Sequence, residues 1–239
     1  MKKQTILIIV PAFNESGNIG RVIEEISASP LPVDILVVND GSRDDTAKEA
    51  SQTRAGVISL PFNLGIGGAV QTGFQFARKH GYDVAVQVDG DGQHDTQFIG
   101  DLLAPLKADR ADVTIGSRFL APFLGYRSTL IRKIGITFFS GLISFLMRCK
   151  ITDPTSGFRA YNKKAIEIFA RYYPHDFPEP EAILVAKRLG LKVEEVPVQM
   201  KKRQAGQSSI RYFKTLYYMV KVTFAILLDM LKKKKGMER

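Results

Sequence analysis

Residues 84–95, VAVQVDGDGQHD, decide the fold of this chain. A short apolar run ends at two aspartates that lie one residue apart, Asp89 and Asp91, and each aspartate is followed by glycine. Apolar runs of this length indicate buried strands, and Asp-Gly pairs indicate turns. The stretch therefore predicts a buried strand whose end presents two carboxylates at one place.

The rest of the chain alternates between such runs and segments with helical spacing. Apolar residues three or four positions apart predict helices that include residues 19–26 and 98–106. Runs rich in Ile and Val predict buried strands at residues 5–10, 33–38, 56–60, 83–88 and 112–115. This alternation predicts an α/β fold in which helices cover both faces of a mostly parallel sheet.

Two local signals predict where helices begin and end. Ser42 followed by Asp45 resembles a capping box, which predicts the start of a helix that runs through Ala50. Gly81 stands where a C-terminal cap would end the helix before the acidic stretch.

Polar residues follow three of the predicted strands. The first strand ends in PAFNE at residues 11–15, the second in NDGS at residues 39–42, and the fourth in DGDGQ at residues 89–93. Open α/β sheets bind ligands at the carboxyl ends of their strands, so three neighbouring ends would form one acidic, glycine-rich cleft. Each segment taken alone is equally well explained as a simple turn.

Paired carboxylates at this position favour a divalent cation. Asp89 and Asp91 can both reach Mg²⁺ or Mn²⁺, which prefer oxygen ligands and leave positions for the phosphates of a substrate. A calcium loop is excluded because His94 and Gly100 occupy the places of its glycine and glutamate.

Two common nucleotide motifs are also absent. The third glycine of a dinucleotide fingerprint would fall on Val70, and Phe74-Gln75 replaces the Lys-Ser pair of a phosphate-binding loop.

Composition sets further bounds. A chain of 239 residues is long enough for one large domain. Lys and Arg outnumber Asp and Glu by 34 to 24, and the net charge of +10 favours an anionic partner such as phosphate, nucleic acid or acidic lipid. The single cysteine, Cys149, cannot form an intramolecular disulfide, and no signal peptide is completed before Pro11. We therefore expect the protein in the cytosol or on the cytosolic face of a membrane.

Seven motifs, in this order, give the chain a family resemblance. They are VPAFNESGNI, VVNDGSRDDT, NLGIGGAVQTGF, QVDGDGQHD, IGSRF, DPTSGFRAY and EVPVQMKKRQAGQSSI. The chain resembles family 2 glycosyltransferases, and among them the catalytic domain of dolichyl- or polyprenyl-phosphate sugar synthases. The resemblance implies a GT-A fold over residues 1–210, a nucleotide-diphosphate sugar donor, a divalent cation and inverting transfer of a hexose to a polyprenyl phosphate.

The resemblance also implies roles for individual residues on the donor side. It implies donor contacts from Pro11, Ala12, Asn14, Glu15, Asp40, Gly41, Ser42 and Asp89. It implies a metal site formed by Asp89, Asp91 and Gln93. A cation held there would neutralise the departing diphosphate as its charge builds up.

The acceptor side separates two hypotheses. A phosphate acceptor needs cations. The resemblance to the polyprenyl-phosphate branch implies a clamp on the acceptor phosphate formed by Arg118, Arg132, Lys202, Arg203 and Ser208. On this hypothesis Asp91, Arg118 and Arg132 are the catalytic candidates. A hydroxyl of a growing glycan would instead need a carboxylate base, for which Glu179 or Glu181 is the candidate. On either hypothesis we expect Asp153 of the DPTSGFR motif to shape the acceptor side, and a structural turn at Asp-Pro is the alternative explanation. Taken singly, each of these basic residues is more often a solvated surface charge.

The C-terminal segment predicts contact with a membrane. Residues 134–147 form an uncharged run of 14, shorter than the roughly 20 that a spanning helix needs. Residues 211–239 combine aromatic and apolar residues with a polybasic cluster, which predicts an amphipathic helix in the plane of anionic lipid. The alternative is a helix packed on the domain. We expect a peripheral membrane enzyme that docks on a small membrane-anchoring protein.

The hypothesis from another class is a non-catalytic module that binds anions or nucleic acid through the basic surface. It is disfavoured because acidic strand ends would repel nucleic acid, so nucleic acid is not an expected partner.

Overall fold

The computed structural model describes residues 4–120, 140, 141, 143–145, 150–175 and 177–201. Within these residues the chain forms one seven-stranded sheet with the strand order β3-β2-β1-β4-β6-β5-β7. The strands are β1 (Ile6–Ala12), β2 (Asp34–Asn39), β3 (Gly56–Ser59), β4 (Val84–Gln87), β5 (Val113–Ser117), β6 (Arg159–Asn162) and β7 (Val193–Pro197). Only β6 runs against its neighbours, so the sheet is mostly parallel, as the alternation predicts.

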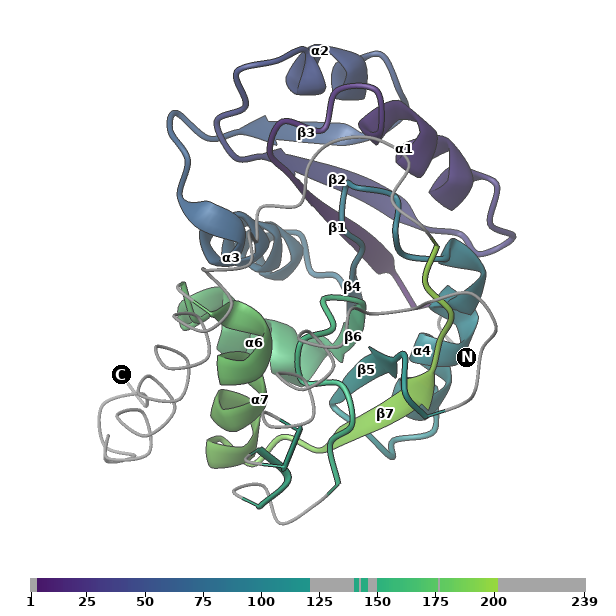
Figure 1. The fold of residues 1–239 in the computed structure, drawn as a ribbon, viewed down its shortest axis with the longest axis vertical. Coiled ribbons are helices and arrows are strands. Elements are labelled where there is room, and N and C mark those ends of the chain that lie inside the picture. The colour runs from purple at the N-terminus through teal and green to yellow at the C-terminus, as the bar shows by residue number, and fades with distance from the viewer. Residues whose placement is uncertain (1–3, 121–139, 142, 146–149, 176, 202–239) are drawn as a thin grey trace.

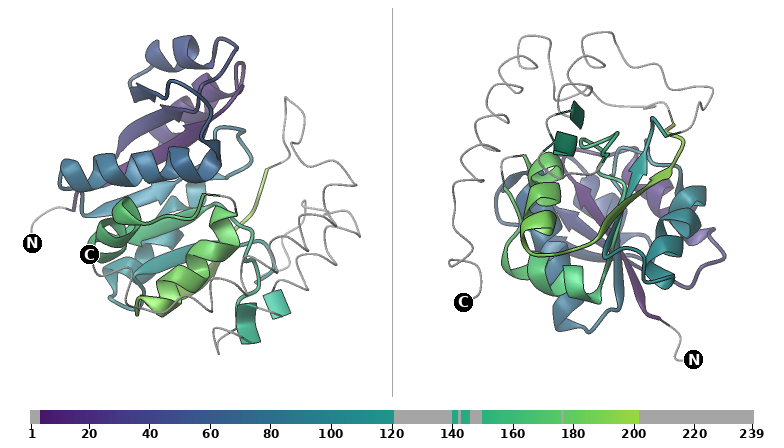
Figure 2. Two further views of the ribbon diagram at one scale, coloured as in Figure 1. Left: turned by 90° about the vertical axis from the view of Figure 1, so that its left-hand side faces the viewer. Right: turned by 90° about the horizontal axis from the view of Figure 1, so that it is seen from below.

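Helices cover both faces of the sheet (Figures 1 and 2). They are α1 (Ile19–Ser27), α2 (Thr46–Ser51), α3 (Gly65–Lys79), α4 (Ile99–Lys107), α6 (Lys163–Arg171) and α7 (Pro178–Arg188), with a short 3₁₀ helix at Thr96–Phe98 before α4. Successive side chains of a strand point to opposite faces. Accordingly Ile6 and Ile8 of β1 pack in the core with α1 and α4, whereas Leu7 and Ile9 pack in the core with α3, α6 and α7.

All five predicted strands are present, and one of them differs in burial. β3 is the edge strand beside β2, and it is partly exposed along its length rather than buried. β6 and β7 were not among the predicted strands. β6 has only four residues, one of them Arg159, and β7 contains two consecutive glutamates, so neither carries an apolar run.

The predicted capping box at Ser42 is wrong. The Ser42 hydroxyl accepts a hydrogen bond from the N–H of Asn14 instead, and α2 begins four residues later, after Asp45, which makes no side-chain cap. The Asp44 carboxylate accepts from the N–H and hydroxyl of Thr46 at the start of α2. Gly81 does stand just beyond the end of α3, with a φ of 73°, as its position predicts.

Several predicted residues lie outside the described residues. They are Arg132, Lys202, Arg203 and Ser208, together with the amphipathic segment at residues 211–239. Of the apolar run at residues 134–147, the structure describes Ile143 as buried and Phe145 as exposed. Among the helices that are described, none has the length and apolar character needed to cross a bilayer.

Candidate active site

The three strand ends predicted to meet do lie side by side. β1 pairs with β2 on one side and with β4 on the other, and all three strands run parallel. Hydrogen bonds between main-chain groups join the segments that follow: the N–H of Asp40 donates to the carbonyl of Ala12 at 2.9 Å, and the N–H of Gly90 donates to the carbonyl of Pro11 at 3.3 Å. The carboxyl ends of the strands therefore form one continuous site.

The loops after β1 and β2 are tied together by short polar side chains. Asn14 adopts a φ of 55°, its N–H donates to the Ser42 hydroxyl at 3.0 Å, and its side-chain oxygen accepts from the N–H of Arg43 at 2.9 Å. The N–H of Glu15 donates to the Thr46 hydroxyl at 2.8 Å. Asn14 and Ser42, which the resemblance assigns to the donor nucleotide, thus also fix the shape of the loop.

Asp40 is a buried acid at the end of β2. Its carboxylate accepts a hydrogen bond of 2.7 Å from the N–H of Leu64. Burial raises the pKa of Asp40, and hydrogen bonds from the N–H groups of Leu64 and Gly65 oppose that rise. The loop before α3, where the motif NLGIGGAVQTGF begins, is therefore part of the same site.

Gly41 is required by close packing against that loop. Its φ is 67°, and a Cβ at this position would lie 2.8 Å from the main-chain nitrogen of Asn63 and 2.8 Å from the carbonyl carbon of Phe62. Any other residue would be strained in its dihedral angle and would also clash with the main chain.

The acidic stretch after β4 forms a closed turn. The Asp89 carboxylate accepts from the Gln87 amide at 3.2 Å, and the Asp89 N–H donates to Nδ1 of His94 at 3.0 Å. His94 is buried, and its ring stacks on Phe158 with centroids 4.8 Å apart. Asp91 Oδ1 accepts from the N–H of Gln93 at 3.0 Å. His94 is a supporting residue that sequence reasoning used only to exclude a calcium loop.

The residues at this turn fit a cation that takes its other ligands from a diphosphate. Gly157 packs directly against Asp89: a Cβ at Gly157 would lie 3.1 Å and 3.3 Å from the two carboxylate oxygens. In the described part of the chain, no group of three or more His, Cys, Asp or Glu residues is arranged to hold a metal. Magnesium usually binds through one or two carboxylates plus substrate phosphates, so the donor set is sufficient when a diphosphate is bound.

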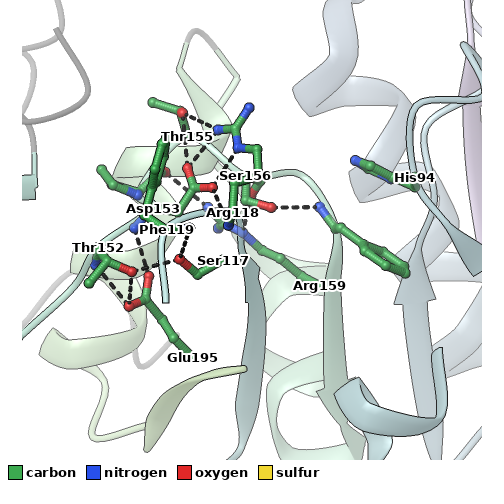
Figure 3. A network of polar contacts seen from close by, with 12 residues as sticks. His94, Ser117, Arg118, Phe119, Thr152, Asp153, Thr155, Ser156, Arg159 and Glu195 are labelled. Carbon is green, nitrogen blue, oxygen red and sulfur yellow. Dashed lines mark hydrogen bonds and ion pairs between the residues drawn. The ribbon is translucent and has the colours of Figure 1, made fainter. Parts of the chain in front are cut away.

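A second buried network lies at the end of β5 (Figure 3). Arg118 donates to Asp153 through Nε and Nη2, both at 2.6 Å, and through its main-chain N–H at 3.1 Å. Nη2 also donates to the Thr155 hydroxyl at 2.9 Å. The side chain of Arg118 is 6% exposed and that of Asp153 is fully buried. Arg118 is therefore an oriented donor whose charge Asp153 balances, and not a solvated surface charge.

The turn at residues 153–159 connects this network to the acidic turn. Gly157 packs on Asp89 and Phe158 stacks on His94, while Asp153 at the beginning of the turn binds Arg118. Arg159 is buried at the end of the turn and donates to the carbonyls of Ser156 and Pro154, at 2.7 Å and 3.1 Å. Those two bonds close the turn, a role that the sequence did not reveal.

Glu179 lies at the beginning of α7 within electrostatic reach of this turn. Burial raises the pKa of the Glu179 carboxyl, the charge of Arg159 lowers it, and the charge of Asp89 raises it. Glu181, the other candidate base, follows in the first turn of the same helix.

Comparisons with known proteins agree with this architecture. The family model described as "Glycosyl transferase family 2" matches residues 7–169. The chain is 30% identical over 83% of its length to UDP-N-acetylglucosamine–dolichyl-phosphate N-acetylglucosaminyltransferase of Methanococcus voltae, covering 86% of that protein. It is 30% identical over 87% of its length to polyprenol monophosphomannose synthase of Mycolicibacterium smegmatis, covering 81% of that protein.

A solved structure shares the fold. Glucosyl-3-phosphoglycerate synthase from Mycobacterium tuberculosis, in complex with Mn²⁺, uridine diphosphate and glucosyl-3-phosphoglycerate, superimposes with a TM-score of 0.71 at 22% identity. The match covers 95% of this chain and 79% of that one. The fold is thus GT-A, as the resemblance implies. The named relatives are enzymes, which argues against a non-catalytic binding module. The chain belongs to glycosyltransferase family 2, and it is a glycosyltransferase.

Proposed function

We propose that the protein transfers a hexose from a nucleotide-diphosphate sugar to a polyprenyl phosphate, with inversion and with the help of a divalent cation. The observation that carries the proposal is the turn at residues 153–159, which joins the Asp89 carboxylate to the oriented guanidinium of Arg118. One end of this turn suits a diphosphate with its cation, and the other suits an anionic acceptor. The names of the two relatives, which both act on lipid phosphates, support the same choice of acceptor.

The donor is held by the three strand ends. Asp40, Gly41 and Ser42 line the end of β2 for the nucleoside, together with Pro11, Ala12, Asn14 and Glu15 from the end of β1. Asp89 and Asp91 would hold Mg²⁺ or Mn²⁺, with Gln93 beside them, and a bound cation would supply positive charge to the leaving diphosphate. Asp89 is kept in place by Gln87, His94 and Gly157.

The acceptor phosphate needs no general base because its oxygen is already anionic. That oxygen attacks the anomeric carbon from the face opposite the diphosphate. The new carbon–oxygen bond forms as the old one breaks, and the bonding electron pair leaves with the diphosphate. Arg118 orients the acceptor through its N–H donors, and Arg132, Lys202, Arg203 and Ser208 are assigned to the same phosphate by resemblance alone.

A lipid acceptor also requires a membrane surface. We assign residues 1–210 to the catalytic domain and residues 211–239 to a helix that lies on the cytosolic face of the membrane. A small membrane protein would assist that docking. Co-purification of the full chain with membranes, and its release by salt, would test this assignment, because polybasic attraction to anionic lipid weakens as ionic strength rises.

The transfer reaction itself tests the main proposal. UDP-N-acetylglucosamine, UDP-glucose and GDP-mannose are each incubated with undecaprenyl phosphate and Mn²⁺ or Mg²⁺, and glycolipid is detected by mass spectrometry. We expect one donor to give a glycosyl phosphate lipid and EDTA to abolish its formation. Transfer to oligosaccharide hydroxyls with none to the lipid phosphate would overturn the proposal.

A second candidate is transfer to a glycan hydroxyl with Glu179 as the base. The observation in its favour is that burial raises the pKa of Glu179, and that the charge of Asp89 raises it further. A Glu179→Gln variant separates the two candidates, with Glu181→Gln for comparison. If the acceptor is a phosphate, neither substitution removes turnover, whereas a base at either position would cost about 100-fold or more when it is lost.

A further inference from the structure

Glu195 is an acidic residue of β7 whose two carboxylate oxygens both accept hydrogen bonds from other residues of the chain. Its Oε2 accepts from the N–H and from the hydroxyl of Thr152, each at 2.8 Å, and its Oε1 accepts from the N–H of Asp153 at 2.8 Å. Figure 3 shows this carboxylate beneath the start of the turn that carries Asp153. Glu195 therefore fixes the main chain at the point where that turn begins.

Two routes lead from Glu195 to Arg118. In the first, the main chain that Glu195 holds places the Asp153 carboxylate, which binds Arg118 through the three contacts described above. In the second, the Thr152 hydroxyl lies 2.6 Å from the Ser117 hydroxyl, and Ser117 is the residue before Arg118 in the chain. The position of the guanidinium thus depends on Glu195 through both its partner and its own backbone.

The Glu195 carboxylate satisfies two main-chain N–H groups and one hydroxyl, so its loss would leave these donors without this partner. Burial raises the pKa of Glu195, three hydrogen bonds from Asp153 and Thr152 lower it, and the charge of Asp153 raises it again. What the carboxylate adds is a defined geometry for the groups it binds.

The neighbouring acid shows the contrast. Glu194 precedes Glu195 in β7, and its carboxylate forms an ion pair of 2.9 Å with Arg110, whose side chain is 56% exposed. The two glutamates are adjacent in sequence, but only Glu195 contacts the turn.

We propose that Glu195 is a positioning residue for the acceptor, acting through Thr152 and Asp153 on Arg118. The inference rests on the proposed function, in which Arg118 meets the phosphate of a polyprenyl phosphate. It adds a residue of β7 that lies outside the region matched by the family model.

The test compares Glu195→Gln with the matched control Glu194→Gln. Glutamine keeps the size of the side chain, but one of its ends is an NH₂ donor and cannot accept an N–H, so at least one of the bonds is lost. Initial rates are measured in the full-length protein with undecaprenyl phosphate as acceptor and the nucleotide sugar that the wild-type protein turns over. We expect the acceptor KM to rise by about 10-fold in Glu195→Gln, with the donor KM and the response to Mn²⁺ unchanged. We expect wild-type values for Glu194→Gln.

A double variant tests the route. Arg118→Ala should raise the acceptor KM, and adding Glu195→Gln to it should cause no further rise, because both substitutions remove the same oriented donor. Thr152→Val keeps the shape of the side chain and removes only its hydroxyl, so it should raise the acceptor KM less than Glu195→Gln does. This variant also keeps the proposal testable if Glu195→Gln does not fold.

Several outcomes would overturn the inference. They are an unchanged acceptor KM in a folded Glu195→Gln protein, equal losses for donor and acceptor, and additive effects in the double variant. A wild-type protein without transfer to undecaprenyl phosphate would instead overturn the proposed function itself. If the wild-type protein transfers sugar to undecaprenyl phosphate but Arg118→Ala keeps a normal acceptor KM, Arg118 does not bind the acceptor. That result would overturn this inference as well.

Discussion

The proposed donor side and the proposed acceptor side of the site are built in different ways. On the donor side, at β2, β1 and β4, the loops are shaped by left-handed backbone at Asn14 and Gly41 and by hydrogen bonds between main chain and short side chains. On the acceptor side, at β5, β6 and β7, the shape comes from the buried pair of Arg118 and Asp153 and from Glu195 beside it. We therefore expect the donor side to be damaged most by substitutions that add atoms next to its main chain. We expect the acceptor side to be damaged most by the loss of a charged side chain.

The largest expected effect comes from removing the two carboxylates at the end of β4. Replacing Asp89 and Asp91 together by alanine should lower kcat by about 1,000-fold or more, because the leaving diphosphate loses its bound cation. Steady-state rates at increasing Mn²⁺ would measure the loss. Asp101→Ala, at an exposed acid in α4, is the control. Undiminished turnover in the double variant would refute a metal-assisted reaction.

The next largest effect is expected for Gly157→Ala, which tests the contact between the turn at residues 153–159 and Asp89. Gly157→Ala would place a Cβ 3.0 Å from the Gln87 amide nitrogen and 3.1 Å from Asp89 Oδ2. Because Gln87 is buried, the Asp89 carboxylate has to shift, and we expect Mn²⁺ affinity to fall by about 10- to 100-fold. Calorimetry with Mn²⁺ and nucleoside diphosphate would measure this. Gly100→Ala, which meets nothing within 4 Å, should leave the affinity intact.

A smaller effect is expected at Gly41, whose main chain packs directly against the main chain of Phe62 and Asn63. Gly41→Ala should weaken nucleoside diphosphate binding by about 10-fold, because dihedral strain and the clash with the loop at Asn63 both displace the end of β2. Gly190→Ala is a matched control, since its φ of 72° is similar but nothing lies within 4 Å. Equal losses in stability, with normal nucleotide affinity in both variants, would show that the clash at Gly41 is harmless.

The smallest effect concerns Asp112, which directly precedes β5 at the end of the strand away from the site. Burial opposes ionisation of Asp112, but hydrogen bonds from the Lys192 N–H, Asn162 and Lys164 outweigh it and lower the pKa. A lowered pKa contributes stability above the pKa of the unfolded chain, about 3.9, and that stability is lost as pH falls through the folded value. Asp112→Asn should thus reduce the free energy of unfolding by about 1–2 kcal/mol at neutral pH.

Urea unfolding of both proteins over a range of pH would test that expectation. The difference between Asp112→Asn and the wild type should shrink as the solution becomes acidic, and activity should be unchanged. A difference that is the same at every pH would mean that lost packing, and not the charge, is responsible.

The donor side was predictable from sequence to a greater extent than the acceptor side. Runs of Ile and Val mark the strands, and polar residues directly after three of them indicate where the site lies, while the roles of single residues there come from the family resemblance. Arg159, which is buried, and Glu195, which is half-buried, carry no such mark, because charged residues are usually exposed and a sequence does not show which of them turn inward. The contacts of Asp153 with Arg118 and Glu195 join residues 35 and 42 positions apart.

The reversed direction of β6 has a consequence for how such an enzyme could be altered. The chain leaves the sheet at Ser117 and returns at Arg159 on the same edge, and the two ends of this excursion are fastened to each other between Ser117 and Thr152 and between Arg118 and Asp153. The segment between Arg118 and Thr152 is therefore held at both of its ends. We expect that residues between these two contacts can be exchanged without changing the register of β1, β2 and β4.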